Sequence, residues 1–480
     1  MENTKSQSYL VPLVTLTTLF FMWGFITCMN DILIPYLKGV FELTHFQSNL
    51  VQFAFFTAYF IISLIYFVVS ATVGDPIRRI GYKNTIVSGL LISAVACFLF
   101  FWEAKSQNPQ FIIFLSALFL LGTGFTFLQI AANPLVAILG TPQTASSRLN
   151  LSQGFNSLGT TIAPVIGGFF IFNYFKGSEG ASAVQIPYLV LASVLLLLAG
   201  IIFFSEIPNV ESSNANDSEN DSKIGALKHP HLVFGMLGIF CYVGGEVTIG
   251  SNLVSFMKET HGMAEETASS LLAFYWGGAM IGRFMGSISM SQMENKKKYL
   301  YMALTAIAAF ALIFTITGKL DFCGENIMAQ ISAHFKDVSL YLIFLVLNYL
   351  VFIAAKSIPS RTLGLFAIVN MILIVTMLNT TGHVSLWVIL SVGLFNSIMF
   401  SNVFTLAIDG LGKYTSQGSS LLVMMILGGA VVPPLQGLLA DIANPQIAFA
   451  VPLICYAYLV WYGFKGCKIG KAQTEEEKSI

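Results

Sequence analysis

The stretch WGFITCMNDILIPYLK, residues 23–38, decides the fold of this chain because it places a carboxylate and an amide inside a long apolar segment. The segment runs roughly from 10 to 37, and Asn30 and Asp31 fall in its second half. A charged group at membrane depth costs about 3 kcal/mol on insertion scales. Such a residue needs a functional reason, so Asp31 is a candidate site for a proton or a coupling cation.

The composition indicates a helical membrane protein with many spans. Of the 480 residues, 55% are hydrophobic and 10% are charged, whereas soluble domains carry about 25% charged residues. Lysine plus arginine equals aspartate plus glutamate, and the resulting net charge of zero predicts no nucleic-acid partner. The first apolar run is too long for the core of a cleavable signal peptide. The spacing of the 6 cysteines indicates neither a metal site nor a disulfide framework.

Runs of about 20 apolar residues, each long enough to cross a bilayer, divide the sequence into fourteen expected spans. Six precede an acidic, serine- and asparagine-rich segment at 209–222, which has the composition of a disordered linker. Eight follow that segment. The expected spans lie near 10–37, 47–72, 83–102, 110–139, 147–174, 187–205, 231–257, 265–290, 299–318, 338–356, 362–380, 384–408, 416–440 and 446–464.

Lysine and arginine are denser in alternate loops, and loops of that kind face the cytoplasm. The loop 74–84, the run 296–298 and the C-terminal tail belong to this set. Because the expected number of spans is even, both termini fall on the cytoplasmic side together with the linker.

Two stretches of the chain resemble each other and indicate a duplicated six-span unit. Residues 36–61 align with 256–282 when one residue is inserted, which matches spans one and two with spans seven and eight. Two parallel six-span repeats with a polar cytoplasmic linker bind substrate near the membrane midplane, between the halves. Two spans exceed this pattern, so we interpret the pair near 299–356 as an inserted hairpin. The expected parts are bundles at 1–205 and 230–466, a linker at 206–229 and a tail at 467–480.

Glu246 is a second carboxylate at membrane depth, in the span FCYVGGEVTIGSNLVSFMK. It precedes Lys258 by twelve residues and so lies about 18 Å deeper. Asp31 precedes Lys38 by seven residues and lies about 10 Å deeper. Low polarity favours the neutral form of a carboxylic acid, so either group could carry a proton. A sodium site would need several further oxygens, which Asn30 and nearby carbonyls could supply. A structural hydrogen bond between helices is the alternative for each carboxylate.

Amide side chains recur at helical spacing in the fourth and fifth expected spans. Gln129 and Asn133 are four residues apart and share one helix face. Planar amides suit the hydroxyl groups of a sugar, and aromatic rings suit its C–H face. The same amides could instead join helices to one another. The candidate sugar ligands of the whole chain are Asn30, Gln129, Asn133, Gln153, Asn156, Tyr275 and Asn396.

The loop GDPIRRIGYKN, residues 74–84, resembles the short cytoplasmic signature of the major facilitator superfamily. Arg79, Gly81 and Lys83 fit that signature, which implies a role in a cytoplasmic gate. Arg78 stands where an aspartate is commonest. The alternative is that these residues only keep positive charge on the cytoplasmic side.

Longer runs narrow the resemblance to one branch of that superfamily. WGFxTCxNDILIPYLK, LQxAANPxVAxLG, SRLNLSQGFNSLGTTxAP, YVGxEVxIGS and SVGLFNSIMF resemble the fucose permeases and glucose/galactose transporters. The resemblance implies uptake of a hexose with a cation, across a bacterial inner membrane, by alternating access. It places the first-helix carboxylate of the branch on Asp31. Gln129 stands where the fucose permeases have glutamate, and Ser401 stands where the branch usually has proline.

From the residues and the resemblance together we expect an all-α major facilitator fold of about 14 spans that takes up glucose or galactose with a cation. A proton is the simplest coupling ion, sodium is the other, and we expect no cofactor or metal. Asp31 and Glu246 are the expected coupling residues, and Glu246 could instead be a sugar ligand. The same carrier could take fucose or N-acetylglucosamine, or the chain could be a non-transporting membrane sugar sensor. We expect a monomer in contact with lipid and a small-molecule sugar, and not an enzyme, because no catalytic constellation lies at membrane depth.

Overall fold

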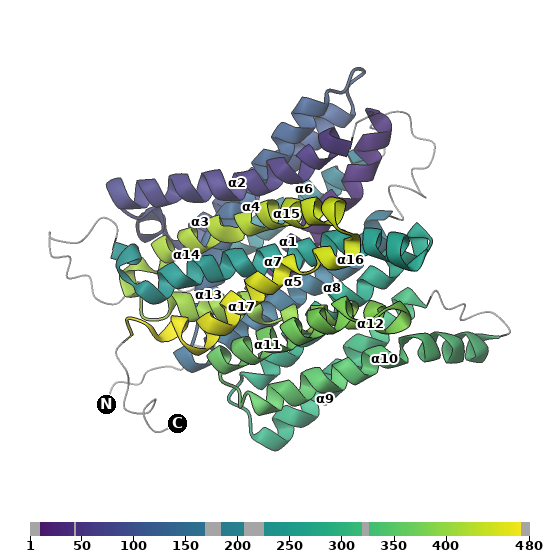
Figure 1. Cartoon of the computed structure of the whole chain (residues 1–480). Helices are drawn as coiled ribbons and strands as arrows, with labels where there is room; N and C mark the ends of the chain where they lie inside the picture. The colour runs from purple at the N-terminus through teal and green to yellow at the C-terminus, as the bar shows by residue number, and fades with distance from the viewer. Residues whose placement is uncertain (1–9, 43–44, 169–183, 206–224, 319–325, 472–480) are drawn as a thin grey trace. The chain divides into compact units, whose positions relative to one another are not determined.

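All regular structure that is described in this chain is helical, and it divides into two compact units (Figure 1). The units are Met1–Asn220 and Asp221–Ile480. The division falls within the predicted linker, most of which lies outside the described residues, as does the end of the predicted tail. The computed structural model describes residues 10–42, 45–168, 184–205, 225–318 and 326–471.

The described part of the first unit contains the long helices α1 (Leu10–Val40), α2 (His45–Thr72), α3 (Pro76–Ala104), α4 (Phe111–Ile138), α5 (Ala145–Gly168) and α6 (Gln185–Phe204). α1 packs against α5, while α3 packs against both α4 and α6. Glycines allow the first of these contacts, because a Cβ on Gly24 would lie 2.1 Å from the carbonyl oxygen of Asn156. Small residues at crossing points are common where membrane helices approach closely.

The described part of the second unit contains five uninterrupted long helices and three interrupted ones. Pro230 and Pro359 begin two of them, as expected for a residue without an N–H group. The uninterrupted helices are α7 (Pro230–His261), α8 (Glu265–Ser289), α9 (Asn295–Thr317), α10 (Ile327–Ala354) and α11 (Pro359–Leu378). The interrupted ones are α12 (Gly382–Asn396) with α13 (Met399–Ile408), α14 (Thr415–Met424) with α15 (Gly428–Ile442), and α16 (Pro445–Ala448) with α17 (Val451–Phe464).

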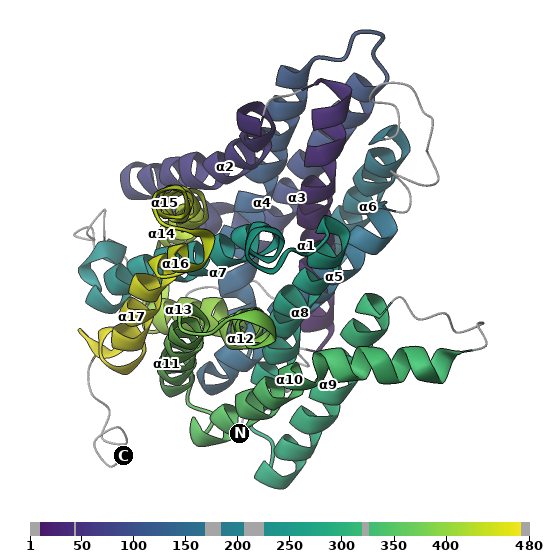
Figure 2. The ribbon, with the colours of Figure 1, turned by 45° about the vertical axis from the view of Figure 1, so that its right-hand side comes forward.

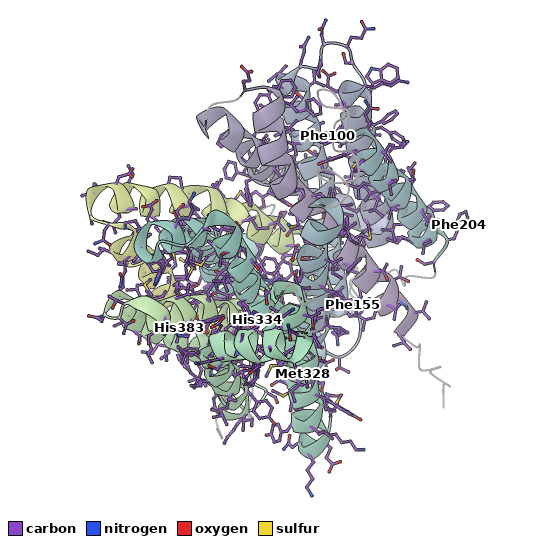
Figure 3. All side chains as sticks on the ribbon, turned by 90° about the vertical axis from the view of Figure 1, so that its right-hand side faces the viewer. Phe100, Phe155, Phe204, Met328, His334 and His383 are labelled. Carbon is purple, nitrogen blue, oxygen red and sulfur yellow. The ribbon has the colours of Figure 1, made fainter. Side chains whose placement is uncertain are left out.

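These helices account for the fourteen spans that the sequence predicts. By length and composition, 12 segments of the described chain can cross a membrane. The other two are α5 and α8, which have 24 and 25 residues and are more polar. Large apolar side chains project outward, as a lipid environment requires: Phe204 is 84% exposed and Met328 is 77% exposed (Figure 3). The predicted fold class is confirmed.

The helix packing shows which two helices of the second unit have no counterpart in the six-helix pattern of the first. In the first unit α3 packs on α4 and α6, and in the second unit α11 packs in the same way on α12 and α17. The contact of α2 with α4 likewise corresponds to that of α8 with α12. No described helix of the first unit corresponds to α9 or α10, which pack on α8 and α12 at the edge of the second unit (Figure 2). α9 and α10 therefore form the inserted hairpin that the sequence predicts.

The helix that contains Asn396 is interrupted although it lacks the proline usual in the related branch. α12 ends at Asn396, and α13 begins at Met399 after Ser397 and Ile398. The interruption lies before Ser401, so a proline at that position is not what causes it. The side chain of Ser397 donates a hydrogen bond to the carbonyl oxygen of Leu394 at 2.7 Å, within the interrupted segment. The break places polar backbone and side-chain groups in the middle of a buried span.

Candidate functional site

The two residues of the opening stretch lie in α1, but only their backbones are described. Asn30 and Asp31 are helical in the second half of α1. Their side chains fall outside the described part of the structure. The coupling role of Asp31 and the ligand role of Asn30 therefore stay predictions.

The predicted amides of the first unit come together from α4 and α5. Gln153 Nε2 donates a hydrogen bond to Asn133 Oδ1 at 3.4 Å. The Asn133 side chain is fully buried, and its Nδ2 has no hydrogen-bond partner among the described residues. An unpaired buried amide costs about 1–3 kcal/mol, so this nitrogen is a place where a ligand hydroxyl would restore a lost hydrogen bond. Asn156, in contrast, donates to the Phe20 carbonyl oxygen at 3.0 Å and thereby ties α5 to α1.

Gln129 belongs to an aromatic wall in the same unit. It is 5% exposed and hydrogen-bonds the hydroxyl group of Tyr59 on α2, which also bonds Trp23 on α1. The ring centroid of Trp23 lies 6.4 Å from that of Phe125 on α4 in an edge-to-face arrangement. The wall thus joins one amide to aromatic rings from three helices, which is the combination that sugars require.

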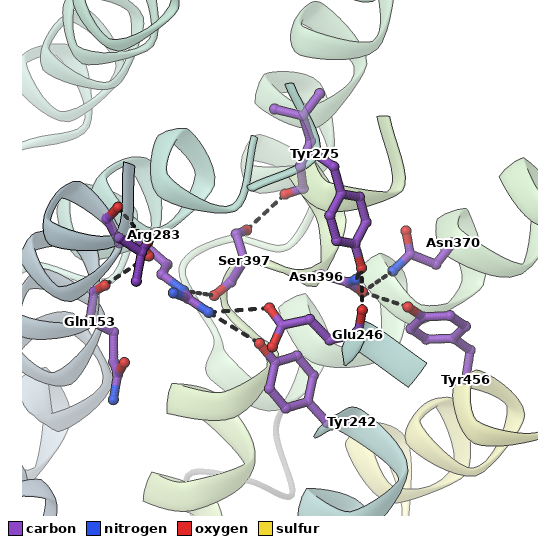
Figure 4. Close-up of polar contacts among 12 residues, drawn as sticks. Gln153, Tyr242, Glu246, Tyr275, Arg283, Asn370, Asn396, Ser397 and Tyr456 are labelled. Carbon is purple, nitrogen blue, oxygen red and sulfur yellow. Dashed lines mark hydrogen bonds and ion pairs between the residues drawn. The ribbon is translucent and has the colours of Figure 1, made fainter. Parts of the chain in front are cut away.

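A charged network lies inside the second unit and centres on Arg283 of α8 (Figure 4). Its Nη2 lies 3.3 Å from Glu246 Oε1 on α7, and the side chains of Arg283 and Glu246 are 12% and 11% exposed. The same nitrogen donates to the Tyr242 hydroxyl at 3.2 Å. Arg283 Nε donates to the Ser397 carbonyl oxygen at 3.1 Å, at the interruption between α12 and α13. One guanidinium therefore joins a carboxylate of α7 to the interrupted helix.

Asn396 is the centre of a second polar cluster beside this network (Figure 4). Its Oδ1 accepts hydrogen bonds from Asn370 Nδ2 at 2.8 Å and from the Tyr456 hydroxyl at 2.7 Å. Its Nδ2 donates to the Tyr275 hydroxyl at 2.8 Å. That hydroxyl donates in turn to the carbonyl oxygen of Glu246 at 2.8 Å. The predicted ligands Asn396 and Tyr275 are therefore engaged by protein groups from α7, α8, α11, α12 and α17.

The two clusters together hold Glu246 at both its backbone and its side chain. Removing one partner of a buried ion pair leaves an uncompensated charge, which costs about 3–5 kcal/mol. Protonation of Glu246 would also remove a charge, but it would leave Arg283 with the Tyr242 hydroxyl and the Ser397 carbonyl. The ion pair between Glu246 of α7 and Arg283 of α8 therefore weakens when Glu246 binds a proton and strengthens when it loses one.

Sequence reasoning found only part of this network. It identified Glu246, but Arg283 was not among the predicted site residues. The structure pairs Arg283 with Glu246. Tyr242 could have been included because it precedes Glu246 by four residues and shares its helix face. No sequence pattern pointed to Asn370 and Tyr456, because they lie on α11 and α17, far from Asn396 in the sequence.

In the predicted cytoplasmic signature, Arg79 and Lys83 cap the C-terminal ends of two helices of the first unit. Arg79 donates to the Val73 carbonyl oxygen after α2, and Lys83 Nζ donates to the Ser205 carbonyl oxygen after α6 at 2.8 Å. Cations at helix C-termini interact favourably with the helix dipole. Gly81 interrupts α3 with a φ of 83°, which favours glycine. These contacts are local, and a gating role for the three residues stays a prediction.

Comparisons with known proteins agree over nearly the whole chain. Residues 14–322 match the Major Facilitator Superfamily model. The chain is 41% identical over 473 residues to a glucose/galactose transporter of Brucella abortus, covering 97% of each chain. It is 29% identical over 479 residues to the L-fucose-proton symporter of Escherichia coli, covering 95% of this chain and 93% of that one. The crystal structure of the E. coli fucose:proton symporter matches with a TM-score of 0.73 and 26% identity, over 98% of this chain and 100% of the other. The chain belongs to the major facilitator superfamily.

Proposed function

We propose that this protein takes up a hexose, glucose or galactose, together with a proton by alternating access. The observation that supports this most strongly is the buried pair Glu246–Arg283 in a membrane chain. Ionisable groups at membrane depth mark ion and proton pathways. The relative named as a glucose/galactose transporter is similar over 97% of this chain, and it supports the choice of sugar.

In this proposal Asp31 and Glu246 hold the coupling proton. Each carboxylate is neutral when loaded, and the loaded carrier changes conformation. When empty, each is ionised, and Glu246 then attracts Arg283 at full strength. The proton is favoured over sodium because one relative is named as a proton symporter. An arm of the uptake experiment with a sodium gradient tests the other cation.

We propose that the sugar is bound in the first unit by Gln129, Asn133 and Gln153. The unpaired Nδ2 of Asn133 would donate to a sugar hydroxyl, and Trp23 would supply an aromatic face. Asn30 extends this set, as the sequence predicts. Asn156, whose Nδ2 donates to the Phe20 carbonyl oxygen, would add only its Oδ1. For Tyr275 and Asn396 we propose a different role. Their polar atoms bond protein groups, so they would position Glu246 rather than contact sugar.

We also propose that the protein is a monomer in a bacterial inner membrane, with both termini in the cytoplasm. The distribution of lysine and arginine supports the orientation. Reporter fusions to the two ends test it, because both should be active only as cytoplasmic reporters.

Uptake of labelled sugars into proteoliposomes tests the function. We expect glucose or galactose to accumulate when the outside is acidic, and unlabelled fucose to compete weakly. If sugar accumulates only under a sodium gradient, sodium and not the proton is the coupling ion. Equal uptake with and without either gradient would contradict symport.

A further inference from the structure

Two buried cysteines from distant parts of the sequence meet inside the second unit. Cys241 of α7 and Cys455 of α17 are 8% and 7% exposed. Their thiols hydrogen-bond each other, and α7 packs on α17 (Figure 1). Both are free thiols, and neither belongs to the polar clusters around Arg283 and Asn396. The pair is therefore a separate chemical feature of this unit.

The packing of α7 on α17 allows the two sulfurs to meet. Cys241 and Gly245 are four residues apart and share one face of α7. A Cβ on Gly245 would lie 3.6 Å from the Cβ of Cys455, so the lack of a side chain there lets α17 approach closely. Cys241 lies about 16 Å from the start of α7, and Cys455 lies about 14 Å from the end of α17. These depths match, as expected for neighbouring helices that run in opposite directions.

Each cysteine directly precedes a tyrosine of the polar clusters. Tyr242 accepts a hydrogen bond from Arg283 at 3.2 Å, and Tyr456 donates to Asn396 Oδ1 at 2.7 Å. Successive residues of a helix point about 100° apart, so each thiol faces the neighbouring helix while the tyrosine beside it faces the polar groups. A change in packing at the thiols therefore reaches both tyrosines through a single peptide bond.

The surroundings of the thiol pair favour a neutral product over a bound metal ion. Among the described residues, no group of three His, Cys, Asp or Glu side chains could hold a metal ion, whereas structural zinc takes four ligands. Two thiolates with a monovalent soft cation such as Cu(I) would keep a net charge at membrane depth, which is costly. A disulfide is neutral, so burial does not oppose it.

We propose that Cys241 and Cys455 form a reversible disulfide when hydrogen peroxide oxidises them, and that this bond arrests transport. One sulfur attacks the peroxide and becomes a sulfenic acid, which releases one water; the second sulfur then displaces the hydroxyl group as another water. The two thiols thus lose two electrons and two protons, and the peroxide is reduced to two waters. Cytoplasmic thiol reductants return the pair to its ordinary reduced state.

The bond would act on transport by moving one helix against the other. A disulfide holds its sulfurs about 2.05 Å apart, closer than hydrogen-bonded sulfurs lie, so its formation shifts α17 relative to α7. The shift displaces Tyr242 and Tyr456 from Arg283 and Asn396. The effect on transport rests on the proposed symport, whereas the formation of the disulfide does not.

Peptide mass spectrometry of the purified full-length protein after treatment with hydrogen peroxide tests the bond itself. Iodoacetamide blocks the remaining thiols before digestion. We expect a linked pair of peptides that contain Cys241 and Cys455, and we expect dithiothreitol to separate them. Cys97 is fully buried and Cys467 is 2% exposed, so both should stay thiols. Absence of the linked peptides would overturn the proposal, whether or not the protein transports sugar.

Uptake of labelled glucose by proteoliposomes tests the consequence. We expect peroxide to lower the initial rate of the wild type about ten-fold, since displacements of about 1 Å at a functional site have effects of that size or larger, and dithiothreitol to restore it. Cys241→Ser should resist peroxide. Cys467→Ser, at a thiol that bonds the Gly463 carbonyl oxygen, is the control and should be inhibited like the wild type.

Two results in this assay would overturn the regulatory role. One is unchanged uptake by wild type whose linked peptides show that the disulfide has formed. The other is inhibition of Cys241→Ser by peroxide to the same extent as the wild type. If Cys241→Ser does not fold, Cys455→Ser gives the same test with the same expected resistance.

Discussion

Glu246→Gln removes the carboxylate charge that faces Arg283 and keeps the shape of the side chain. The two side chains are 11% and 12% exposed, and Glu246 Oε1 lies 3.3 Å from Arg283 Nη2, so water screens the pair weakly. Breaking such a pair costs about 3–5 kcal/mol of unfolding free energy. Arg283 keeps its bonds to the Tyr242 hydroxyl and the Ser397 carbonyl. We therefore expect the lower end, about 3 kcal/mol.

The double variant Glu246→Gln with Arg283→Gln separates the ion pair from general disruption. It leaves no buried charge unpaired, so we expect its loss to be smaller than the sum of the two single losses by about 2 kcal/mol. Denaturant titration in detergent micelles, followed by the helical circular dichroism signal, measures these free energies. Glu294→Gln, at an exposed carboxylate, is the control and should change stability by less than about 0.5 kcal/mol. If the double variant loses as much unfolding free energy as the two single variants together, Glu246 and Arg283 do not stabilise the protein as an ion pair.

Three further substitutions test the amide group of α4 and α5, the cluster around Asn396 and the cation at the end of α6. Gln153→Ala should raise the half-saturating sugar concentration about ten-fold through loss of one hydrogen bond in the amide group. It should leave the maximal uptake rate near that of wild type, and exposed Asn84→Ala should change neither quantity. Asn396→Leu leaves buried polar groups without partners and should lower the unfolding free energy by about 3 kcal/mol. An unfolding free energy equal to that of the wild type would contradict the role of Asn396 as the centre of its polar cluster. Lys83→Gln removes a cation from the end of α6 and should cost about 0.5–1 kcal/mol without changing sugar affinity in the uptake assay.

Most of the fold could be predicted from the sequence because membrane spans are a local property. A run of about 20 apolar residues is visible without knowledge of its neighbours. The inserted hairpin was predictable for the same reason, since the second half has two runs more than the first. The start of α10 at Ile327 was not, because this polar part of the helix lies outside the apolar run.

The candidate site was only partly predictable because tertiary packing decides which polar groups meet. Glu246 is visible as an expensive carboxylate in an apolar run. The pairing of Arg283 with Glu246 depends on how α7 and α8 pack, and this packing cannot be predicted from the sequences of the two helices. Asn396 shows the same limit: its residue type suggested a sugar ligand, but its neighbours on α11 and α17 occupy its oxygen.

The most direct test of proton coupling at Asp31 is accumulation of labelled glucose by proteoliposomes under an imposed pH gradient, for the wild type and for Asp31→Asn. Proton symport predicts that the wild type concentrates the sugar when the outside is acidic. It predicts that Asp31→Asn still exchanges sugar across the membrane but does not concentrate it, because the coupling proton has no carboxylate to bind. Accumulation by Asp31→Asn equal to that of the wild type would contradict the assignment of Asp31 as a coupling residue.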